Sequence, residues 1–549
     1  MPSRQLHLAQ AGPAEVADAL AALRAEVGLP AMFPAEAREE AERVAADGGH
    51  GGDAPTRQDR RDVELVTIDP PGSMDLDQAV HVASSGRGYI VRYAIADVAA
   101  FVRPGGALDA EAHRRGTTVY GPDVRTPLHP TVLSEGAASL LPDEDRPAVL
   151  WTIGLDADGE ITSSSVTRAT VRSRARLTYG EAQAQLDAGV ASDSLSLLAD
   201  VGRLRQARER DRGGVSLEVP EQEIVPRPGG FSLELRRTLP VQGWNAQISL
   251  LTGIAAARLM RAGGVGILRT LPPADPRDVA RLRRTARALG IDWPADESYG
   301  RLLRTLDSAR PHHAAFLTEA TTLFRGASYL AFGGSGLPAV DALPAGDGTV
   351  HAAIAAEYAH VTAPLRRLVD RYGTEACLAT SAGTAVPAWV LDGLAGLPRL
   401  MARAGQKAGS FERACLDTLE AALVVDQVGD VFDGVVVDVD DRPAKPAKAS
   451  EATEAGSSTG AADSSGAPGA PGRRGQVVVA RPALRAPVTG TALPLGDPVR
   501  VRLVEASIEA RRVAFVLAEG DPVAADGDGG RADGDPVAAD GDAPSGVRS

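Results

Sequence analysis

The pattern of hydrophobic and polar residues divides the chain into a helical beginning, a mixed α and β middle, and a β-rich end. Hydrophobic residues recur at helical spacing over 14–27, and a second helix is predicted from Pro34 to about Ala46. Short apolar runs separated by turn residues follow from Glu64 to Val102 and predict β-strands, with a hairpin of 79–83 and 89–96 around the turn at 84–88. A second hairpin, of 150–155 and 161–171, is predicted around the turn sequence Asp-Ala-Asp-Gly at 156–159. Helical patterns return at 245–262, 276–289, 311–326 and 363–378.

The end of the chain has the pattern of a small β-barrel. Residues 410–426 form an amphipathic helical pattern, after which Val431 to Val439 resumes a strand. Between Val499 and Leu503 hydrophobic residues alternate with arginines, which predicts a strand with one buried face and one basic, solvated face. Several short strands of this kind are typical of a barrel of the oligonucleotide-binding (OB) type.

Two segments have no such pattern. Residues 442–475 consist almost wholly of Ala, Gly, Ser, Pro, Lys and Glu and are predicted to be a disordered insert in the barrel. Residues 519–549 contain the sequence DPVAADGD twice, and acidic residues far outnumber arginines there. This composition buries too little apolar surface to fold, so an acidic disordered tail is predicted.

Composition excludes several classes of protein. A chain of 549 residues that is 44% hydrophobic can bury a sizeable core, and a net charge of −14 argues against a dedicated DNA-coating protein. No apolar run approaches the roughly 18 residues that span a bilayer, so no membrane partner is expected. Two cysteines, Cys377 and Cys415, suit a reducing compartment, and a cytoplasmic location is expected.

Two arginine-rich runs, 203–212 and 277–287, are candidates for contact with a nucleic-acid backbone. The alternative is that each run is a solvated helix face whose arginines pair with nearby acids, and for a single run this alternative is favoured.

The segment from Thr67 to Val80 holds the most informative acidic residues. A predicted strand ends in Asp69, and the sequence Pro-Pro-Gly that follows forces a turn. Asp75 and Asp77 are two residues apart, so an extended backbone points them the same way, and the turn can return Asp69 to them. Converging carboxylates repel one another unless a cation lies among them, and hard oxygen ligands suit Mg²⁺ or Mn²⁺. An ordinary acidic loop fits the spacing equally well.

A second segment, from Glu357 to Asp370, is a candidate phosphate site. Pro364 fits the first turn of a helix, which predicts that Arg366 and Arg367 lie near a helix N-terminus. Free backbone amides and arginine forks both favour a phosphate there. A helix start with two solvated arginines is the alternative.

Together with other blocks, these segments resemble the ribonuclease II/ribonuclease R (RNB) exoribonucleases. The blocks occur in the family's order and cover roughly residues 60–375. Besides the acidic loop they are Ile95–Val98, Val102–Gly105, Leu108–Asp123, Pro127–Pro130, Leu133–Ser134, Ser139–Leu140 and Ala359–Arg367.

The resemblance implies an α+β multidomain protein, with a mixed α/β RNB catalytic core followed by a degenerate S1-like barrel of the OB type. The expected divisions are a small helical segment at 1–58, the RNB core at 59–378, a helical extension at 379–428, the interrupted barrel at 429–518 and the tail at 519–549. The implied activity is 3′→5′ hydrolysis of single-stranded RNA to nucleoside 5′-monophosphates with Mg²⁺, or Mn²⁺. A monomer that does not act on DNA is expected.

The resemblance also assigns roles to individual residues. Asp77 matches the aspartate on which catalysis chiefly depends, and Arg366 matches the arginine that holds the scissile phosphate. Tyr120 matches an aromatic residue that stacks on a base near the 3′ end. The implied metal positions are Asp69, Asp75 and Gln78, and the implied RNA contacts are Tyr120, Arg367 and Glu412.

Departures from the family's pattern leave two other interpretations open. Gln78 stands at the fourth acidic position and offers a carbonyl oxygen without a charge, and Gln247 stands where a family glutamate is common. One alternative is therefore a catalytically attenuated or inactive RNB protein that acts as an RNA-binding regulator. The other is a metal-dependent phosphodiesterase that acts on DNA or on a small molecule.

Overall fold

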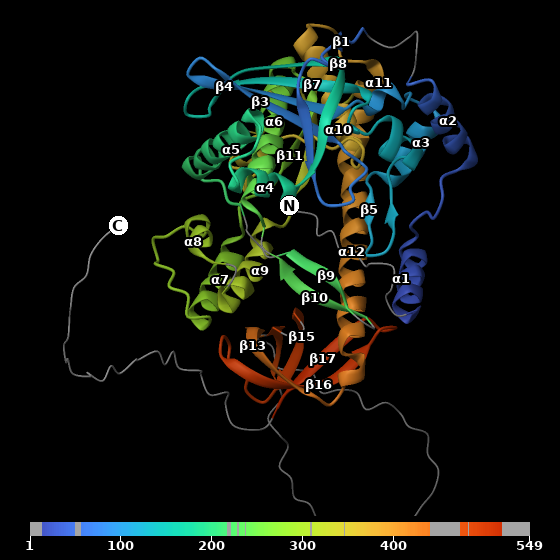
Figure 1. Ribbon diagram of the computed structural model, residues 1–549. Coiled ribbons are helices and arrows are strands. Elements are labelled where there is room, and N and C mark those ends of the chain that lie inside the picture. The colour runs from blue at the N-terminus through green and yellow to red at the C-terminus, as the bar shows by residue number, and fades with distance from the viewer. Residues whose placement is uncertain are drawn as a thin grey trace, which may run out of the picture.

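The computed structural model describes residues 14–49, 56–216, 221–227, 230–236, 238–307, 310–344, 346–439, 473–480 and 483–518. Figure 1 shows a mixed α/β body at the top, a β-barrel at the bottom and one long helix, α12, running from the one toward the other. The predicted tail and most of the predicted insert lie outside the described residues. Within the described residues no helix is long and apolar enough to cross a membrane.

A six-stranded sheet forms the centre of the α/β body, in the order β1-β8-β2-β3-β4-β7. The predicted strands and both predicted hairpins are confirmed, β3 with β4 and β7 with β8. The strand β8 is long enough to pair with β7 along one part and with β2 along the other. The bounds are β1 Gln58–Asp59, β2 Leu65–Asp69, β3 Gln78–Ser85, β4 Gly88–Ala96, β7 Asp145–Leu155 and β8 Ile161–Thr178.

Helices cover both faces of this sheet because successive side chains of a strand point to opposite faces. Tyr93 of β4 belongs to one hydrophobic core, with residues of α5, α6 and α10. Its neighbour Ala94 belongs to a second core, with residues of α2 and α3. The bounds are α2 Ala35–Ala46, α3 Ala107–Arg115, α4 Tyr179–Asp187, α5 Asp193–Asp211, α6 Pro240–Gly263 and α10 Leu368–Ala382.

Smaller elements surround this body. A helical group packs around Phe316 and reaches the barrel through Val437. The N-terminal helix α1 packs on α12, and Val119 of the short strand β5 joins their shared core. The bounds are α1 Ala14–Val27, α7 Pro276–Ala288, α8 Tyr299–Thr305, α9 Pro311–Ala320, α11 Ala388–Gly393 and α12 Leu397–Val424, with paired strands β5 Val119–Tyr120 and β6 Arg125–Thr126, β9 Glu221–Arg227 and β10 Gly230–Arg236, and β11 Gly266–Thr270 and β12 Ser328–Phe332.

The predicted barrel is closed, in the order β13-β14-β15-β17-β16. Val499, Val501 and Leu503 are buried and alternate with exposed residues, as the sequence predicts. The strand β14 begins at Arg473, so the last three residues of the predicted insert belong to the barrel. The bounds are β13 Val431–Val439, β14 Arg473–Ala480, β15 Ala483–Gly490, β16 Pro498–Ser507 and β17 Arg512–Leu517.

Candidate active site

The acidic loop between β2 and β3 is held in place by Ser139. The Ser139 hydroxyl donates a hydrogen bond of 2.6 Å to the carbonyl oxygen of Met74 and accepts one of 3.0 Å from the amide of Leu76. Gly72 makes the preceding turn with a φ of 79°, which a residue without a Cβ adopts readily. The loop therefore has a fixed course, and this fixes where Asp75 and Asp77 stand.

Asp77 and Arg366 meet although they lie far apart in the sequence. The Oδ1 atom of Asp77 accepts a hydrogen bond of 2.8 Å from the amide of Leu365, 288 residues away. Its Oδ2 atom lies 3.6 Å from the Nε of Arg366. Asp77 is only 5% exposed, whereas the side chain of Arg366 is 35% exposed. The arginine can therefore reach a ligand while it remains beside the buried carboxylate.

The other side of the site consists of Asp75 and the hairpin β5–β6. Arg125 donates a hydrogen bond of 2.8 Å to Oδ1 of Asp75 and also forms an ion pair with Glu135. The hydroxyl of Tyr120 lies 3.4 Å from Oδ2 of Asp75. Tyr120 thus stands beside the acidic loop, and its role in stacking on a base stays a prediction.

The electrostatics of the site leave two carboxylates short of positive charge. Burial raises the pKa of Asp69 to about 6, with a further contribution from Asp75, although Arg366 opposes the rise. Burial also raises the pKa of Asp77 to about 8, against the influence of Arg366 and of the Leu365 amide. Both carboxylates would be stabilised in their ionised form by an added cation.

Gln78 is directed differently from the predicted metal ligands. Its Nε2 donates a hydrogen bond of 2.5 Å to the carbonyl oxygen of Thr362, and its Oε1 accepts one of 2.9 Å from the hydroxyl of Tyr93. Both ends of the amide are engaged, so the conformation does not favour Gln78 as a ligand. Its assignment to the metal site stays a prediction.

The side chains fit a magnesium ion only in its water-rich mode of binding. No group of three or more His, Cys, Asp or Glu side chains that could hold a metal ion occurs within the part of the chain that the structure describes. Mg²⁺ is commonly held by one or two carboxylates, with water and substrate phosphates completing its shell. Asp69 and Asp77 are suited to that role because burial penalises their charge.

The prediction that a helix begins at Pro364 is wrong, because α10 begins at Leu368. Ala363 to Arg367 form a turn, and Arg367 then adopts an extended conformation and bridges to Thr117. The buried carboxylate of Asp370 holds this turn by accepting hydrogen bonds from the Ala363 amide, at 2.7 Å, and from the Arg367 guanidinium, at 2.7 and 2.8 Å. Tertiary contacts therefore replace the expected first helical turn.

These contacts separate the roles of the two arginines. The Arg367 guanidinium is occupied by Asp370, so its predicted RNA contact would compete with an existing ion pair.

Glu412 lies on α12 next to Phe411, which packs with Val119, and its contact with RNA stays a prediction. Sequence reasoning missed Arg125, since a single arginine in a turn carries no pattern; its only signal is its position just after the matched block that contains Tyr120.

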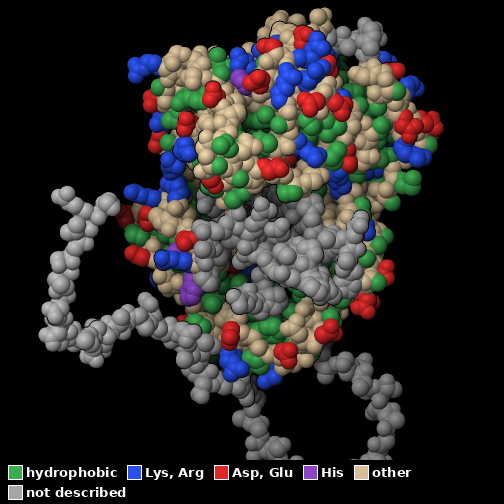
Figure 2. Space-filling view, viewed as in Figure 1, with side chains coloured by type: hydrophobic (Ala, Val, Ile, Leu, Met, Phe, Trp, Pro, Cys, Tyr) green, Lys and Arg blue, Asp and Glu red, His purple; other side chains and the backbone are tan. Residues whose placement is uncertain are grey.

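The two arginine-rich runs behave as structural features. In the first run, Arg205 and Arg212 donate hydrogen bonds of 2.7 Å to the backbone oxygens of Gly159 and Ile354. In the second run, Arg283 donates to several carbonyl oxygens of 293–297. Figure 2 shows basic and acidic side chains interspersed over the upper part of the visible face. The alternative of helix faces with local partners therefore describes both runs better.

Comparison with known proteins places two regions of the chain in described families. Residues 57–374 match the RNB domain, and residues 468–518 match the RNase II-type exonuclease C-terminal S1 domain. The first match covers the acidic loop, the β5–β6 hairpin and Arg366, and the second falls on the closed barrel.

Individual relatives agree with these matches. The chain is 29% identical to human exosome complex exonuclease RRP44 over 58% of this chain and 34% of that protein, and 28% identical to Escherichia coli ribonuclease R over 70% and 49%. The chain thus spans between a third and a half of these relatives. Mycoplasma genitalium RNase R, solved in apo form and with ribose-methylated single-stranded RNA, has the same fold, with a TM-score of 0.74, 19% identity and coverage of 92% and 78% of the two chains.

Proposed function

The chain belongs to the RNB family of exoribonucleases, and from this premise we propose that it hydrolyses single-stranded RNA from the 3′ end and releases nucleoside 5′-monophosphates. The observation that carries the proposal is the meeting of Asp77 with Arg366 at 3.6 Å, beside Asp69, Asp75 and Tyr120. M. genitalium RNase R, which has the same fold, was solved in complex with single-stranded RNA, and this supports RNA as the substrate class.

The chain's own residues would divide the work as follows. Arg366, partly in solvent, holds a non-bridging oxygen of the scissile phosphate and stabilises the negative charge that develops there. Tyr120 closes the pocket around the terminal nucleotide, and Asp77 is held by the Leu365 amide so that its second oxygen faces the same phosphate as Arg366. A bound Mg²⁺, held by Asp69 and Asp77, would neutralise phosphate charge and lower the pKa of an attacking water.

The test is hydrolysis of 5′-labelled oligo(A) by the purified chain with Mg²⁺, with parallel reactions in EDTA and on the matching DNA oligomer. A ladder of shortened RNA that ends in very small products, absent with EDTA and absent for DNA, is the expected result. A contact with 2′-hydroxyl groups would give the preference for RNA. Internal cuts, or equal cleavage of DNA, would replace the proposal with a general phosphodiesterase.

A second candidate function is RNA binding without turnover. The observation that favours it is the state of the acidic loop, in which Gln78 is engaged by Thr362 and Tyr93 while Asp75 is paired with Arg125. Both contacts reduce the number of oxygen ligands left for a metal. In the same assay this candidate predicts a mobility shift of the labelled RNA with no shortening at any Mg²⁺ concentration.

We also propose that the protein acts as a cytoplasmic monomer. Cys377 and Cys415 are both free and buried, and this state persists in a reducing compartment. Fractionation of cells and light scattering of the purified chain test the two parts of this proposal.

A further inference from the structure

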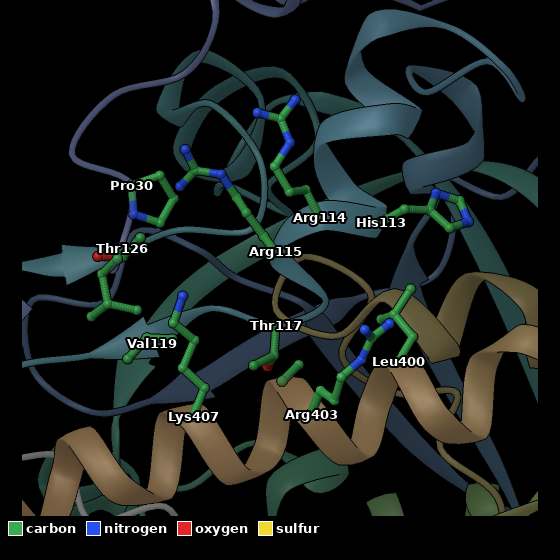
Figure 3. Close-up of a pocket in the computed structure, with 12 residues that line it drawn as sticks. Pro30, His113, Arg114, Arg115, Thr117, Val119, Thr126, Leu400, Arg403 and Lys407 are labelled. Carbon is green, nitrogen blue, oxygen red and sulfur yellow. The ribbon is translucent and has the colours of Figure 1, made fainter. Parts of the chain in front are cut away.

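A basic cavity lies outside the acidic site, between α3, α12 and the segment that follows α1. Its volume is about 350 Å³, at the lower end of the range of small-molecule sites. The lining includes the cationic residues Arg114, Arg115, Arg403 and Lys407 together with His113, and no Asp or Glu is among the lining residues. Figure 3 shows Arg403 and Lys407 on the helix at the bottom, Thr117 near the level that they reach, and Arg114 and Arg115 above, with the Arg114 side chain directed upward and away from Arg403.

The cavity is separate from the catalytic cluster. Val119 and Tyr120 are consecutive in β5, so their side chains point to opposite faces of the strand. Val119 lines the basic cavity, whereas the Tyr120 hydroxyl lies near Asp75. The strand therefore divides a basic compartment from an acidic one.

Not all of the positive charge in the cavity is already used. The buried Arg115 is fully engaged, with Glu111, two backbone oxygens and the ring of Phe33. Arg114 lies 2.8 Å from the same Glu111 carboxylate but is 65% exposed. Arg403 is exposed and has no hydrogen bond or ion pair within the described residues. One carboxylate thus faces two arginines, and Arg403 adds a charge without a partner.

The remaining walls suit a flat organic group. Leu29, Pro30, Val119, Leu400 and Ala404 supply an apolar surface beside the cations. Lys407 crosses from α12 to the carbonyl oxygen of Gly28, at 2.6 Å, and so holds the segment that carries Leu29 and Pro30 against the helix. A ligand with a phosphate at one end and a ring at the other would satisfy both kinds of wall.

We propose that this cavity binds a nucleoside monophosphate unit, with the phosphate at Arg403 and the sugar and base against the apolar wall of Leu400 and Ala404. The unit can come from a free nucleotide or from an RNA strand outside the catalytic channel, since both present the same chemistry. The proposal concerns binding alone and does not depend on whether the chain hydrolyses RNA.

The test is isothermal titration of the whole chain in EDTA with 5′-AMP, adenosine and inorganic phosphate, and separately with oligo(A). The variant is Arg403→Ala, and the matched control is Arg399→Ala, one helical turn away on α12 and not part of the cavity lining. Arg366→Ala is titrated as well, because it reports any binding of AMP at the catalytic cluster.

We expect 5′-AMP to bind with a dissociation constant below about 1 mM and adenosine to bind more weakly. Arg403→Ala should weaken the binding of AMP about tenfold, whereas Arg399→Ala should leave it unchanged. Any loss in Arg366→Ala measures AMP bound at the catalytic cluster, so the tenfold loss from Arg403→Ala should persist in the Arg366→Ala background. If Arg403→Ala loses affinity for AMP, the site takes free nucleotides. If it loses affinity for oligo(A) alone, the site takes part of an RNA strand. If Arg403→Ala weakens the binding of neither AMP nor oligo(A), or if Arg399→Ala causes an equal loss, the proposal is wrong.

Discussion

Replacing Asp77 by asparagine should make the protein more stable while it abolishes hydrolysis. Asp77 is 5% exposed, and burial raises its pKa from 3.8 to about 8. The folded protein therefore prefers the neutral acid over a pH range in which the unfolded chain prefers the carboxylate. The contribution of Asp77 to the free energy of unfolding of the wild type is fully present below about pH 4 and is lost progressively as the pH rises toward 8. Asparagine keeps the shape of the side chain and removes this dependence.

The size of the gain follows from the pKa. One pKa unit corresponds to about 1.4 kcal/mol, so a rise from 3.8 to about 8 sets an upper limit of about 6 kcal/mol. Relaxation and water entry reduce the penalty for buried charges considerably, so we expect a gain of about 1–3 kcal/mol at pH 8.5. At pH 5 the gain should be much smaller, because Asp77 is then protonated in the fold and the unfolded chain is only slightly past its own pKa.

The assay is urea unfolding in EDTA at pH 5, 7 and 8.5, so that no metal compensates the carboxylate. The control is Asp75→Asn, which removes a carboxylate of the same loop that is paired with Arg125 at 2.8 Å. This variant should be less stable than the wild type or equally stable, because it loses the ion pair with Arg125. If Asp77→Asn is less stable than the wild type at all three pH values, Arg366 already compensates the buried charge and the reasoning is wrong.

Three further outcomes follow from the same cluster. Gln78→Asp should maintain or raise the rate of hydrolysis at limiting Mg²⁺. It should also lower the free energy of unfolding in urea by about 1 kcal/mol, because the hydrogen bond to the Thr362 oxygen is lost. A lower rate at every Mg²⁺ concentration would show that the amide is part of the working site. Arg366→Lys should lower kcat about 100-fold in steady-state kinetics, since lysine keeps the charge but loses the planar fork; an unchanged kcat would remove Arg366 from the reaction. The Mg²⁺ concentration that gives a half-maximal rate should decrease as the pH is raised from 6 to 8. Asp69 and Asp77 must ionise to hold the metal, and their pKa values are raised to about 6 and about 8. A requirement for Mg²⁺ that does not change with pH would contradict this.

Local patterns predicted the elements of this fold well because their causes are local. The alternation from Val499 to Leu503 and the turn residues between β7 and β8 each specify a strand or hairpin without reference to distant residues. The meeting of Asp77 with Arg366 has no such local cause. It was expected only because the matching blocks stand in the order of a known family.

The errors have a common physical origin in tertiary contacts. Pro364 carries a helix-start signal, but Asp370 and the bridge between Arg367 and Thr117 hold that segment as a turn. The basic cavity could not be predicted either, because its lining comes from α3, β5, β6, α12 and the segment after α1, and none of these segments alone has an unusual charge. Only the folded chain brings their cations together.

Gln78 makes structural hydrogen bonds at a position where the family resemblance implies a metal ligand. Asp77 and Gln78 are consecutive, and both hold the segment that leads to Arg366: Asp77 accepts from the amide of Leu365, and Gln78 donates to the oxygen of Thr362. A carboxylate at position 78 could not donate to that oxygen. The glutamine therefore strengthens the placement of Arg366 while it gives up a charged ligand, so hydrolysis by this chain should be limited by metal affinity and not by the position of its arginine.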